Sequence, residues 1–192
     1  MKEIGHLYFI MWVSGAGKWT VLDWLKIEKN KKIQFLKSYV TRRMRPWEKN
    51  WDIYWFISNE EFEEWINNND FLEYEINHKV AYYGTKKSEV EEGLKKWNTL
   101  IKEIDTKWII QLQEKHPDFR KNYTSIFLDV PDEVLRSRFF ERNPEWKEQD
   151  LDNRIESAEF ERKQAEQYCD HIIDASQSKD DVLSEIKKII EL

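Results

Sequence analysis

The sequence predicts an α/β fold in which helices flank a mostly parallel sheet. Apolar runs of strand length alternate with helical patterns along the chain, and this alternation is typical of a parallel sheet. The apolar run 7–11 also leads into a glycine-bearing loop with a lysine, and an amphipathic helical pattern follows. Strand, loop and helix in this order are the layout of a phosphate-binding P-loop. We therefore expect a parallel sheet of the P-loop NTPase type, with a small mixed lobe and a lid segment.

Length and composition restrict the class of protein. A chain of 192 residues can form one hydrophobic core with small inserted lobes, so we expect a single domain. A single cysteine, Cys169, rules out an intramolecular disulfide and is typical of the reducing cytoplasm. We see neither an apolar stretch of membrane-spanning length nor a signal peptide. The net charge of -6 argues against nucleic-acid binding, so we expect a cytoplasmic protein without nucleic-acid or membrane partners.

The predicted phosphate-binding loop lies between a first strand, expected over 5–12, and a first helix, expected over 18–29. Backbone N–H groups at a helix start can hold an anion, and Lys18 adds a positive charge. The predicted phosphate-binding residues are Ser14, Gly15, Ala16, Gly17, Lys18, Trp19 and Thr20. The usual pattern has glycine where Trp12 stands and a hydroxyl residue where Trp19 stands. An ordinary strand-to-helix turn with one exposed lysine is the alternative interpretation.

Glycine is scarce in this chain and tryptophan is abundant. There are 5 glycines and 10 tryptophans, whereas ordinary usage predicts about 13 glycines in a chain of this length. Trp47 follows Pro46 and Trp51 follows Asn50, and both dipeptides would usually continue with a turn glycine. Trp97 follows a helical stretch, at the place of a C-terminal glycine cap. Tryptophan thus occupies positions where backbone geometry favours glycine.

The segment 37–85 is predicted to form a small lobe that binds an anion. A short strand is expected over 33–37, and the basic run from Ser38 to Pro46 contains no acidic residue. Arginine side chains grouped in this way suit a phosphate ligand. Ser58 and Glu61 form a capping box that begins a helix. Further strands are expected over 52–57, 71–75 and 80–85.

The rest of the chain is predicted to complete the core and to form a lid. A helix over 86–96 is followed by a strand over 99–105, which places Glu103 and Asp105 on one face. The later elements expected are a helix through Gln113, a strand over 124–130, a helix from Asp132, a helix over 153–168, a strand over 171–174 and a helix over 179–191. The polar stretch 143–152 is expected to be a mobile flap, flanked by Arg136, Arg138, Arg142, Arg154 and Arg162. The core thus comprises 1–36, 86–136 and 154–192, and the lid comprises 137–153.

Several motifs, in the same order and at similar spacing, resemble the guanylate kinase family of P-loop nucleoside monophosphate kinases. The first is the run Ser38-x-x-Thr41-Arg42-x-x-Arg45-Pro46, followed by Glu48 and by Asp52-x-Tyr54-x-Phe56. The others are Phe71-Leu72-Glu73, Tyr82-Tyr83-Gly84-Thr85 and Glu103-Ile104-Asp105. The resemblance extends from the P-loop to the C-terminal helix.

The resemblance implies ATP-dependent phosphorylation of GMP, and of dGMP, in purine nucleotide metabolism. The implied GMP-binding residues are Ser38, Arg42, Arg45, Tyr54, Glu73, Tyr83, Thr85, Glu103 and Asp105. Among these, Glu73 would accept hydrogen bonds from guanine, and the arginines would hold the phosphate. The implied catalytic residues are Lys18, Arg42, Arg138, Arg142 and Arg154. ATP would bind with Mg²⁺ held by phosphates and water, with Thr20 nearby, in a monomer or a homodimer.

Two other functions stay open at this point. One is a related small-molecule kinase of the same fold, and Glu73, Ser38 and Asp105 argue against it because they suit guanine. The other is a non-catalytic guanylate kinase-like module that binds phosphopeptides. Lys18 and the arginines of the lid argue against that module, because it needs neither.

A changed genetic code would account for the tryptophans. Within the family, glycine aligns with Trp12, Trp47, Trp51, Trp97 and Trp108, and serine, threonine or glycine aligns with Trp19. We hypothesise that these six residues are encoded by UGA codons that the organism reads as glycine. A chain that truly has tryptophan at these six positions is expected to fold with strain and to turn over ATP weakly or not at all. The reason is that an indole at position 12 would crowd the phosphate loop.

Overall fold

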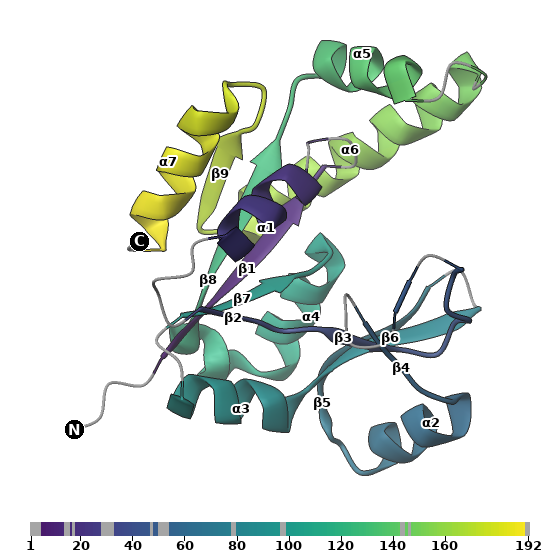
Figure 1. The fold of residues 1–192 in the computed structure, drawn as a ribbon, viewed down its shortest axis with the longest axis vertical. Helices are drawn as coiled ribbons and strands as arrows, with labels where there is room; N and C mark the ends of the chain where they lie inside the picture. The colour runs from purple at the N-terminus through teal and green to yellow at the C-terminus, as the bar shows by residue number, and fades with distance from the viewer. Residues whose placement is uncertain are drawn as a thin grey trace. The chain divides into compact units, whose positions relative to one another are not determined.

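The computed structural model describes residues 5–13, 16, 18–27, 33–46, 48–49, 54–77, 80–96, 99–142, 145 and 147–190, without the side chains of residues 18, 19, 27, 77 and 142 (Figure 1). The chain divides into two compact units. The first is built from Met1–Leu7, Lys32–Lys102 and Gln111–Tyr123, and the second from Tyr8–Lys31, Glu103–Ile110 and Thr124–Leu192. The predicted lobe 37–85 lies wholly within the first unit.

A five-stranded sheet has the strand order β2-β7-β1-β8-β9. Its strands are β1 His6–Trp12, β2 Ile33–Phe35, β7 Thr99–Glu103, β8 Tyr123–Asp129 and β9 His171–Asp174. The pairs β2–β7 and β8–β9 are parallel. Residues 7–11 of β1 are buried, as expected of a parallel strand covered on both faces. The predicted α/β fold is confirmed.

Strand β7 ends two residues earlier than the sequence predicts. Asp105 instead caps the helix α4 Thr106–Lys115, because its Oδ1 accepts a hydrogen bond from the Lys107 backbone N–H at 3.0 Å. The i, i+2 spacing of Glu103 and Asp105 therefore no longer implies a shared strand face. A short polar side chain that caps a helix start also ends the preceding strand.

The remaining helices of the second unit are α1 Lys18–Ile27, α5 Asp132–Arg142, α6 Glu148–Tyr168 and α7 Lys179–Ile189. Helix α1 buries Val21, Leu22 and Leu25, the face that its apolar periodicity predicts. Helix α7 lies beside β9 (Figure 1). Within the described residues, no helix is both long enough and apolar enough to cross a membrane.

Helix α6 begins at Glu148, whereas the sequence predicts a flap over 143–152 and a helix only from 153. Leu151 in the first turn is fully buried, so this turn is anchored to the core. The Lys147 backbone N–H also donates to Asp150 Oδ2 at 3.0 Å, which caps the helix start. The polar composition of this segment does not indicate a helix, although one apolar residue holds its first turn. Residues 143, 144 and 146 of the predicted flap lie outside the described residues.

The first unit contains a four-stranded mixed sheet with the order β4-β3-β6-β5. Its strands are β3 Ser38–Val40, β4 Tyr54–Phe56, β5 Phe71–Asn77 and β6 Ala81–Lys86. Strands β3 and β4 are parallel, and β6 is antiparallel to both β3 and β5. Helices α2 Asn59–Asn67 and α3 Lys87–Lys96 and the 3₁₀ helix η1 Pro117–Asn122 belong to the same unit. The first part of the basic run is thus a strand.

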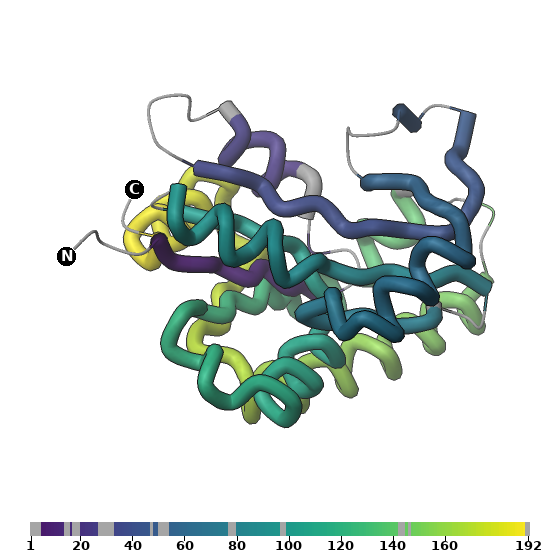
Figure 2. Tube along the Cα trace, turned by 90° about the horizontal axis from the view of Figure 1, so that it is seen from below, coloured from purple at the N-terminus to yellow at the C-terminus, as the bar shows by residue number. Residues whose placement is uncertain are grey.

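Helix α2 covers one face of this sheet (Figure 2). The Ser58 Oγ accepts the Glu61 N–H at 3.1 Å and caps the helix as predicted. The Phe62 ring stacks on the Tyr82 ring with centroids 5.0 Å apart, and Trp65 meets Tyr39 edge-on at 4.9 Å. Because side chains alternate along a strand, the neighbours of these residues face the other side of the sheet.

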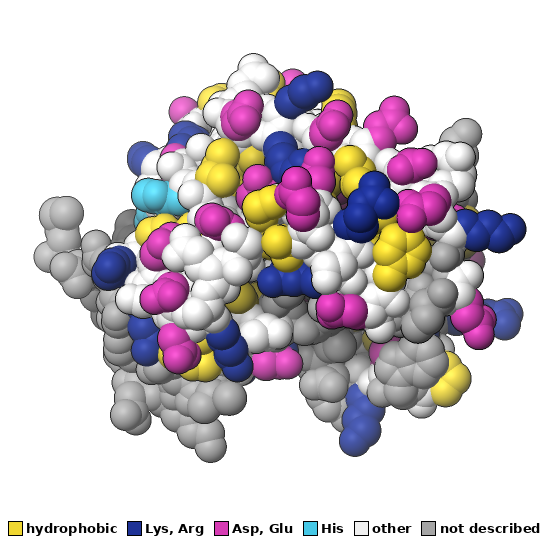
Figure 3. Space-filling view, turned by 90° about the horizontal axis from the view of Figure 1, so that it is seen from above, with side chains coloured by type: hydrophobic (Ala, Val, Ile, Leu, Met, Phe, Trp, Pro, Cys, Tyr) yellow, Lys and Arg dark blue, Asp and Glu magenta, His cyan; other side chains and the backbone are white. Residues whose placement is uncertain are grey.

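The surface carries charges of both signs. On the face drawn in Figure 3, acidic side chains are interspersed with basic ones. Exposed ion pairs include Lys96–Glu92 at 3.0 Å and Arg136–Glu148 at 2.8 Å. Pairs of this kind contribute about 0–1 kcal/mol each, so the fold depends mainly on its buried apolar side chains.

Candidate functional site

The sheet face opposite α2 carries most of the residues predicted to bind a nucleotide. Register pairs Ser38 with Tyr54, and Glu73 with Thr85, and directly paired residues point to the same side. Tyr83 lies two residues before Thr85 on β6 and shares its face. Five predicted site residues from four strands are therefore brought together on one face, and α2 is on the other.

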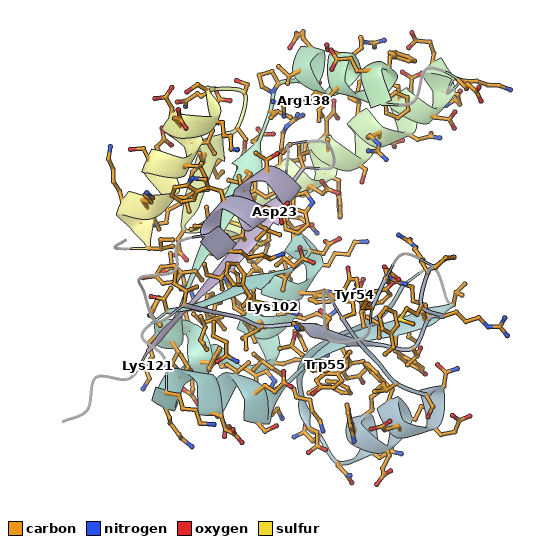
Figure 4. All side chains as sticks on the ribbon, viewed as in Figure 1. Asp23, Tyr54, Trp55, Lys102, Lys121 and Arg138 are labelled. Atoms are coloured by element: carbon orange, nitrogen blue, oxygen red, sulfur yellow. The ribbon has the colours of Figure 1, made fainter. Side chains whose placement is uncertain are left out.

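Three buried polar residues lie on this face, Ser38, Glu73 and Thr85, and the buried Lys102 of β7 in the other sheet contacts Ser38. The Lys102 ammonium on β7 donates to the Ser38 hydroxyl oxygen with Nζ and Oγ 2.6 Å apart. The Thr85 hydroxyl donates to Glu73 Oε1. Figure 4 labels Lys102 on β7 and Tyr54 on β4. A lysine and a glutamate thus belong to one cluster of buried polar side chains.

The second carboxylate oxygen of Glu73 has an unusual environment. Glu73 Oε2 is buried and has no hydrogen-bond partner among the described residues. Burial raises the pKa of Glu73 to about 8, and the nearby Lys102 charge and the Thr85 hydrogen bond oppose that rise. Leaving a buried acceptor unpaired costs about 1–3 kcal/mol. This cost is recovered when a ligand supplies donors to that oxygen.

A second group, around Arg42, lies after the end of β3. Its guanidinium binds Glu48 in a bidentate ion pair, with N···O distances of 2.6 and 2.7 Å. Its Nε donates to the Tyr83 hydroxyl at 3.1 Å, and its Cζ lies 5.2 Å from the ring centroids of both Tyr54 and Phe56. The Arg42 hydrogen bond lowers the pKa of Glu48 to about 2. The arginine is therefore held in position before any ligand arrives.

The other residues predicted to contact GMP lie in different surroundings. Arg45 has an exposed side chain, and its backbone N–H donates to Glu48 Oε2 at 2.8 Å. Glu48 therefore connects the Arg42 side chain with the Arg45 backbone. Glu103 and Asp105 belong to the second unit, where Asp105 is exposed and caps α4.

The predicted phosphate loop is described only in part. Ser14, Gly15 and Gly17 lie outside the described residues. The Ala16 backbone N–H donates to the Val13 carbonyl at 3.0 Å. Lys18 is the first residue of α1, as predicted, although its side chain and that of Trp19 are outside the described atoms.

A cavity of about 260 Å³ lies beside this loop in the second unit. Its lining includes Ala16, Thr20, Arg138, Ala175 and Gln177. Arg138, labelled in Figure 4, donates from Nη2 to the Ala175 carbonyl at 3.3 Å. The start of α1 and a lid arginine thus share one cavity.

The arginines of the predicted lid have different roles. The Arg154 guanidinium lies over the Phe139 ring at 5.4 Å, and the Arg142 side chain is outside the described atoms. Arg162 donates to Asp129 Oδ1 at 2.8 Å and to the Val130 carbonyl at 2.7 Å. Arg162 therefore joins α6 to the end of β8 as a structural residue.

Lys102 is the main site residue that the motif search misses. It lies at the end of an apolar run, between Ile101 and Glu103, and only the strand pairing shows what it contacts. A lysine that continues an apolar strand run is a usable signal, because lysine is almost never fully buried without a partner.

Two of the anomalous tryptophans have described side chains. Trp108 is 6% exposed, and its Nε1 is buried with no acceptor among the described residues. A buried indole N–H usually finds a partner, whereas glycine at this position would have no such group to satisfy. Trp12 is half-buried and lines a cavity of about 220 Å³ with Asp105 and Glu161. Trp47, Trp51 and Trp97 lie outside the described residues.

The glycine hypothesis leads to a direct measurement. Peptide mass spectrometry of the native protein is expected to find glycine at positions 12, 47 and 108. Tryptophan at these positions would exclude the changed code. The codon at position 12 is the matching genetic control, because the hypothesis requires UGA there.

Comparison with known proteins gives the family of this chain. The sequence model described as "Guanylate kinase" matches residues 5–192. The chain is 35% identical to a guanylate kinase of Fusobacterium nucleatum over 182 residues, covering 89% of this chain and 95% of that protein. It is 34% identical to a guanylate kinase of Prochlorococcus marinus over 192 residues, covering 100% of both chains.

A solved structure gives the same result for the fold. The crystal structure of guanylate kinase from Anaplasma phagocytophilum superimposes with a TM-score of 0.71 at 23% identity, covering 100% of this chain and 87% of that one. Since the family's sequence model matches almost the whole chain, and relatives above 30% identity cover it, the chain belongs to the guanylate kinase family.

Proposed function

We propose that this protein transfers the terminal phosphoryl group of ATP to GMP, and to dGMP, giving the nucleoside diphosphate. One observation supports the choice of base above all others. Glu73 Oε2 is a buried carboxylate oxygen with no hydrogen-bond partner among the described residues, on the same sheet face as the buried Ser38 and Thr85 hydroxyls. A ligand with donors would satisfy this acceptor.

Guanine is the base that fits this pocket. Its N1–H and 2-amino group are adjacent donors, and one carboxylate can accept from both. Adenine has no such donor pair on this edge, so it would leave Glu73 unpaired and lose affinity. Thr85 already donates to Oε1 and holds the carboxylate plane. We assign base recognition to Glu73, Ser38 and Thr85, and we keep Glu103 and Asp105 as further GMP-binding candidates.

We assign the phosphate of GMP to the group around Arg42. Arginine forks bind phosphate oxygens through paired hydrogen bonds, and tyrosine hydroxyls can complete the set. Arg42 is already ordered by Glu48 and Tyr83, and Tyr54 lies against its guanidinium. Arg45 has an exposed side chain and would add a second cation. Such preorganisation lowers the entropic cost of binding.

We assign ATP to the loop and cavity of the second unit. Backbone N–H groups of residues 14–20 and Lys18 would hold its phosphates, and Arg138, Arg142 and Arg154 would neutralise the transferring group. The exposed Thr20 hydroxyl on the first turn of α1 suits Mg²⁺, a hard cation that binds oxygen and keeps several waters. Mg²⁺ would reduce the negative charge that the two nucleotides bring together.

These residues would position the two nucleotides and neutralise the negative charge of the transferring phosphoryl group. Phosphoryl transfer needs little covalent help from a protein, so Lys18, Arg42 and the lid arginines suffice as the catalytic residues. Exclusion of water by the lid would prevent hydrolysis of ATP. We further propose a cytoplasmic protein that is a monomer or a homodimer and has neither nucleic-acid nor membrane partners.

A coupled assay of ADP release tests the function. The chain with glycine at positions 12, 19, 47, 51, 97 and 108 is expected to turn over GMP and dGMP in preference to AMP, UMP and ribose phosphates. The chain with tryptophan at these positions serves as the control, and its rate of ADP release is expected to be much lower. Preference for another acceptor would contradict the proposed substrate. ATP binding without turnover of any acceptor would favour a binding module.

A further inference from the structure

Lys102 is a buried cation that the proposed recognition of guanine does not yet use. It is 1% exposed and is among the largest fully buried side chains. Moving an ammonium group out of water costs several kcal/mol unless partners compensate it. The position of Lys102 next to Ser38 and Glu73 indicates that its charge serves the pocket.

The fold accounts for this position. Strand β2 pairs with β7 so that Phe35 lies opposite Ile101, and the Leu36 N–H donates to the Ile101 carbonyl at 2.9 Å. The chain then reaches Ser38 at the start of β3, beside Lys102. The lysine therefore reaches Ser38 from β7, while Glu73 and Thr85 come from β5 and β6.

The hydrogen bond between Lys102 and Ser38 has a fixed direction. An ammonium group has donors and no acceptor, so Ser38 Oγ must be the acceptor in this 2.6 Å contact. The hydroxyl proton of Ser38 then points away from Lys102. Within the described residues no acceptor is recorded for this proton. Ser38 is thereby made a hydrogen-bond donor to a ligand.

We propose that Lys102 is a specificity-determining residue of the nucleotide pocket, which orients Ser38 as a donor and stabilises the Glu73 carboxylate, so that a 6-oxopurine binds and a 6-aminopurine does not. The arrangement matches the edge of guanine, where the O6 acceptor lies next to the N1–H donor. A 6-amino group would instead place its own donors against Ser38 and the lysine charge. This inference rests on the proposed function, since it concerns how the base of GMP is selected.

The electrostatics of the pocket agree with this role. Glu73 faces Lys102 from β7 and Glu75 from its own strand, and Thr85 from β6 hydrogen-bonds it. Burial and Glu75 raise the pKa of Glu73, whereas Lys102 lowers it. Removing the lysine charge would therefore favour the protonated carboxyl, which can accept fewer hydrogen bonds from guanine.

Calorimetric binding of GMP, IMP and AMP to the full chain tests the inference without the ATP site. Lys102→Met nearly keeps the volume of the side chain and removes its charge. We expect it to weaken GMP binding by about 10- to 100-fold and to leave AMP binding within about twofold. IMP shares O6 and N1–H with GMP but lacks the 2-amino group that Glu73 would also accept, so we expect IMP binding to weaken as well, by no more than GMP binding. Lys95→Met, on the exposed part of α3, is the matched control and should change nothing.

The ratio of GMP to AMP affinity across pH adds a second readout, because the phosphate titrates alike in both nucleotides. In the wild-type chain this ratio is expected to rise with pH as Glu73 ionises, and in Lys102→Met the rise should move to higher pH. A folded Lys102→Met variant with unchanged selectivity and an unchanged pH profile would overturn the inference.

A second variant and the wild-type chain provide the remaining controls. If Lys102→Met does not fold, Ser38→Ala decides, since it removes the donor directly: an unchanged ratio of GMP to AMP affinity in that variant also overturns the inference. A wild-type chain that does not bind GMP would overturn the proposed function. GMP binding by the wild-type chain together with an unaffected Lys102→Met overturns only the role of Lys102.

Discussion

Replacing Glu73 with glutamine is expected to weaken GMP binding about 100-fold, the combined cost of one lost hydrogen bond to a carboxylate and one contact between two donors. Glutamine has nearly the same shape, but its amide presents donors where guanine also presents donors. The nucleotide would then lose one hydrogen bond and face a second donor. Isothermal calorimetry with GMP measures the effect, and Glu64→Gln on the exposed face of α2 is the control. Equal GMP affinity in the two variants would remove Glu73 from the site.

The same substitution is expected to change the dependence of stability on pH. The Glu73 pKa is about 8 in the folded chain and near 4.5 in the unfolded one. The unfolded chain therefore loses this proton at lower pH than the folded chain, and the folded state is penalised as pH rises from about 4.5 to 8. Glu73→Gln lacks this penalty, so its melting temperature relative to the wild type should rise across that window. A constant difference would contradict the raised pKa.

Replacing Arg42 with lysine is expected to raise the KM for GMP about 100-fold and to lower kcat. Lysine cannot form the bidentate pair with Glu48, bond Tyr83 and lie flat against Tyr54 at the same time. The phosphate of GMP would meet a less ordered cation. Steady-state kinetics with GMP as the varied substrate measures both constants.

The adjacent residue supplies the control for Arg42. Arg43 has an exposed side chain in the same basic run, and Arg43→Lys should leave both constants within about twofold. Similar losses in the two variants would mean that general positive charge, and not the Arg42 geometry, binds the phosphate. Glu48 adds a pH signature: since its folded pKa is about 2, the stability from the Arg42–Glu48 pair is present above pH 4.5 and is lost as pH falls toward 2.

Local patterns predicted much of this molecule. The buried run 7–11 and the helix from Lys18 lie where the apolar periodicity puts them, and the Ser58 cap is formed. Polar composition predicted the structure less well. The segment predicted to be a flap contains the first turn of α6, because one buried residue, Leu151, is enough to anchor a helix of otherwise polar composition. The end of β7 was missed because Asp105 caps a helix, a role that strand spacing does not reveal.

The sequence by itself determined the fold class, the phosphate-loop layout and the family, because these depend on periodicity and on the order of motifs along the chain. Only the tertiary structure decided which polar groups share a pocket. Register places Glu73 opposite Thr85, and the pairing of β2 with β7 brings Lys102 to Ser38, 64 residues away in the sequence. Burial then decides the protonation of Glu73. Contacts between distant residues and the removal of water from buried groups arise only when the chain packs, so they cannot be predicted from any local segment of the sequence.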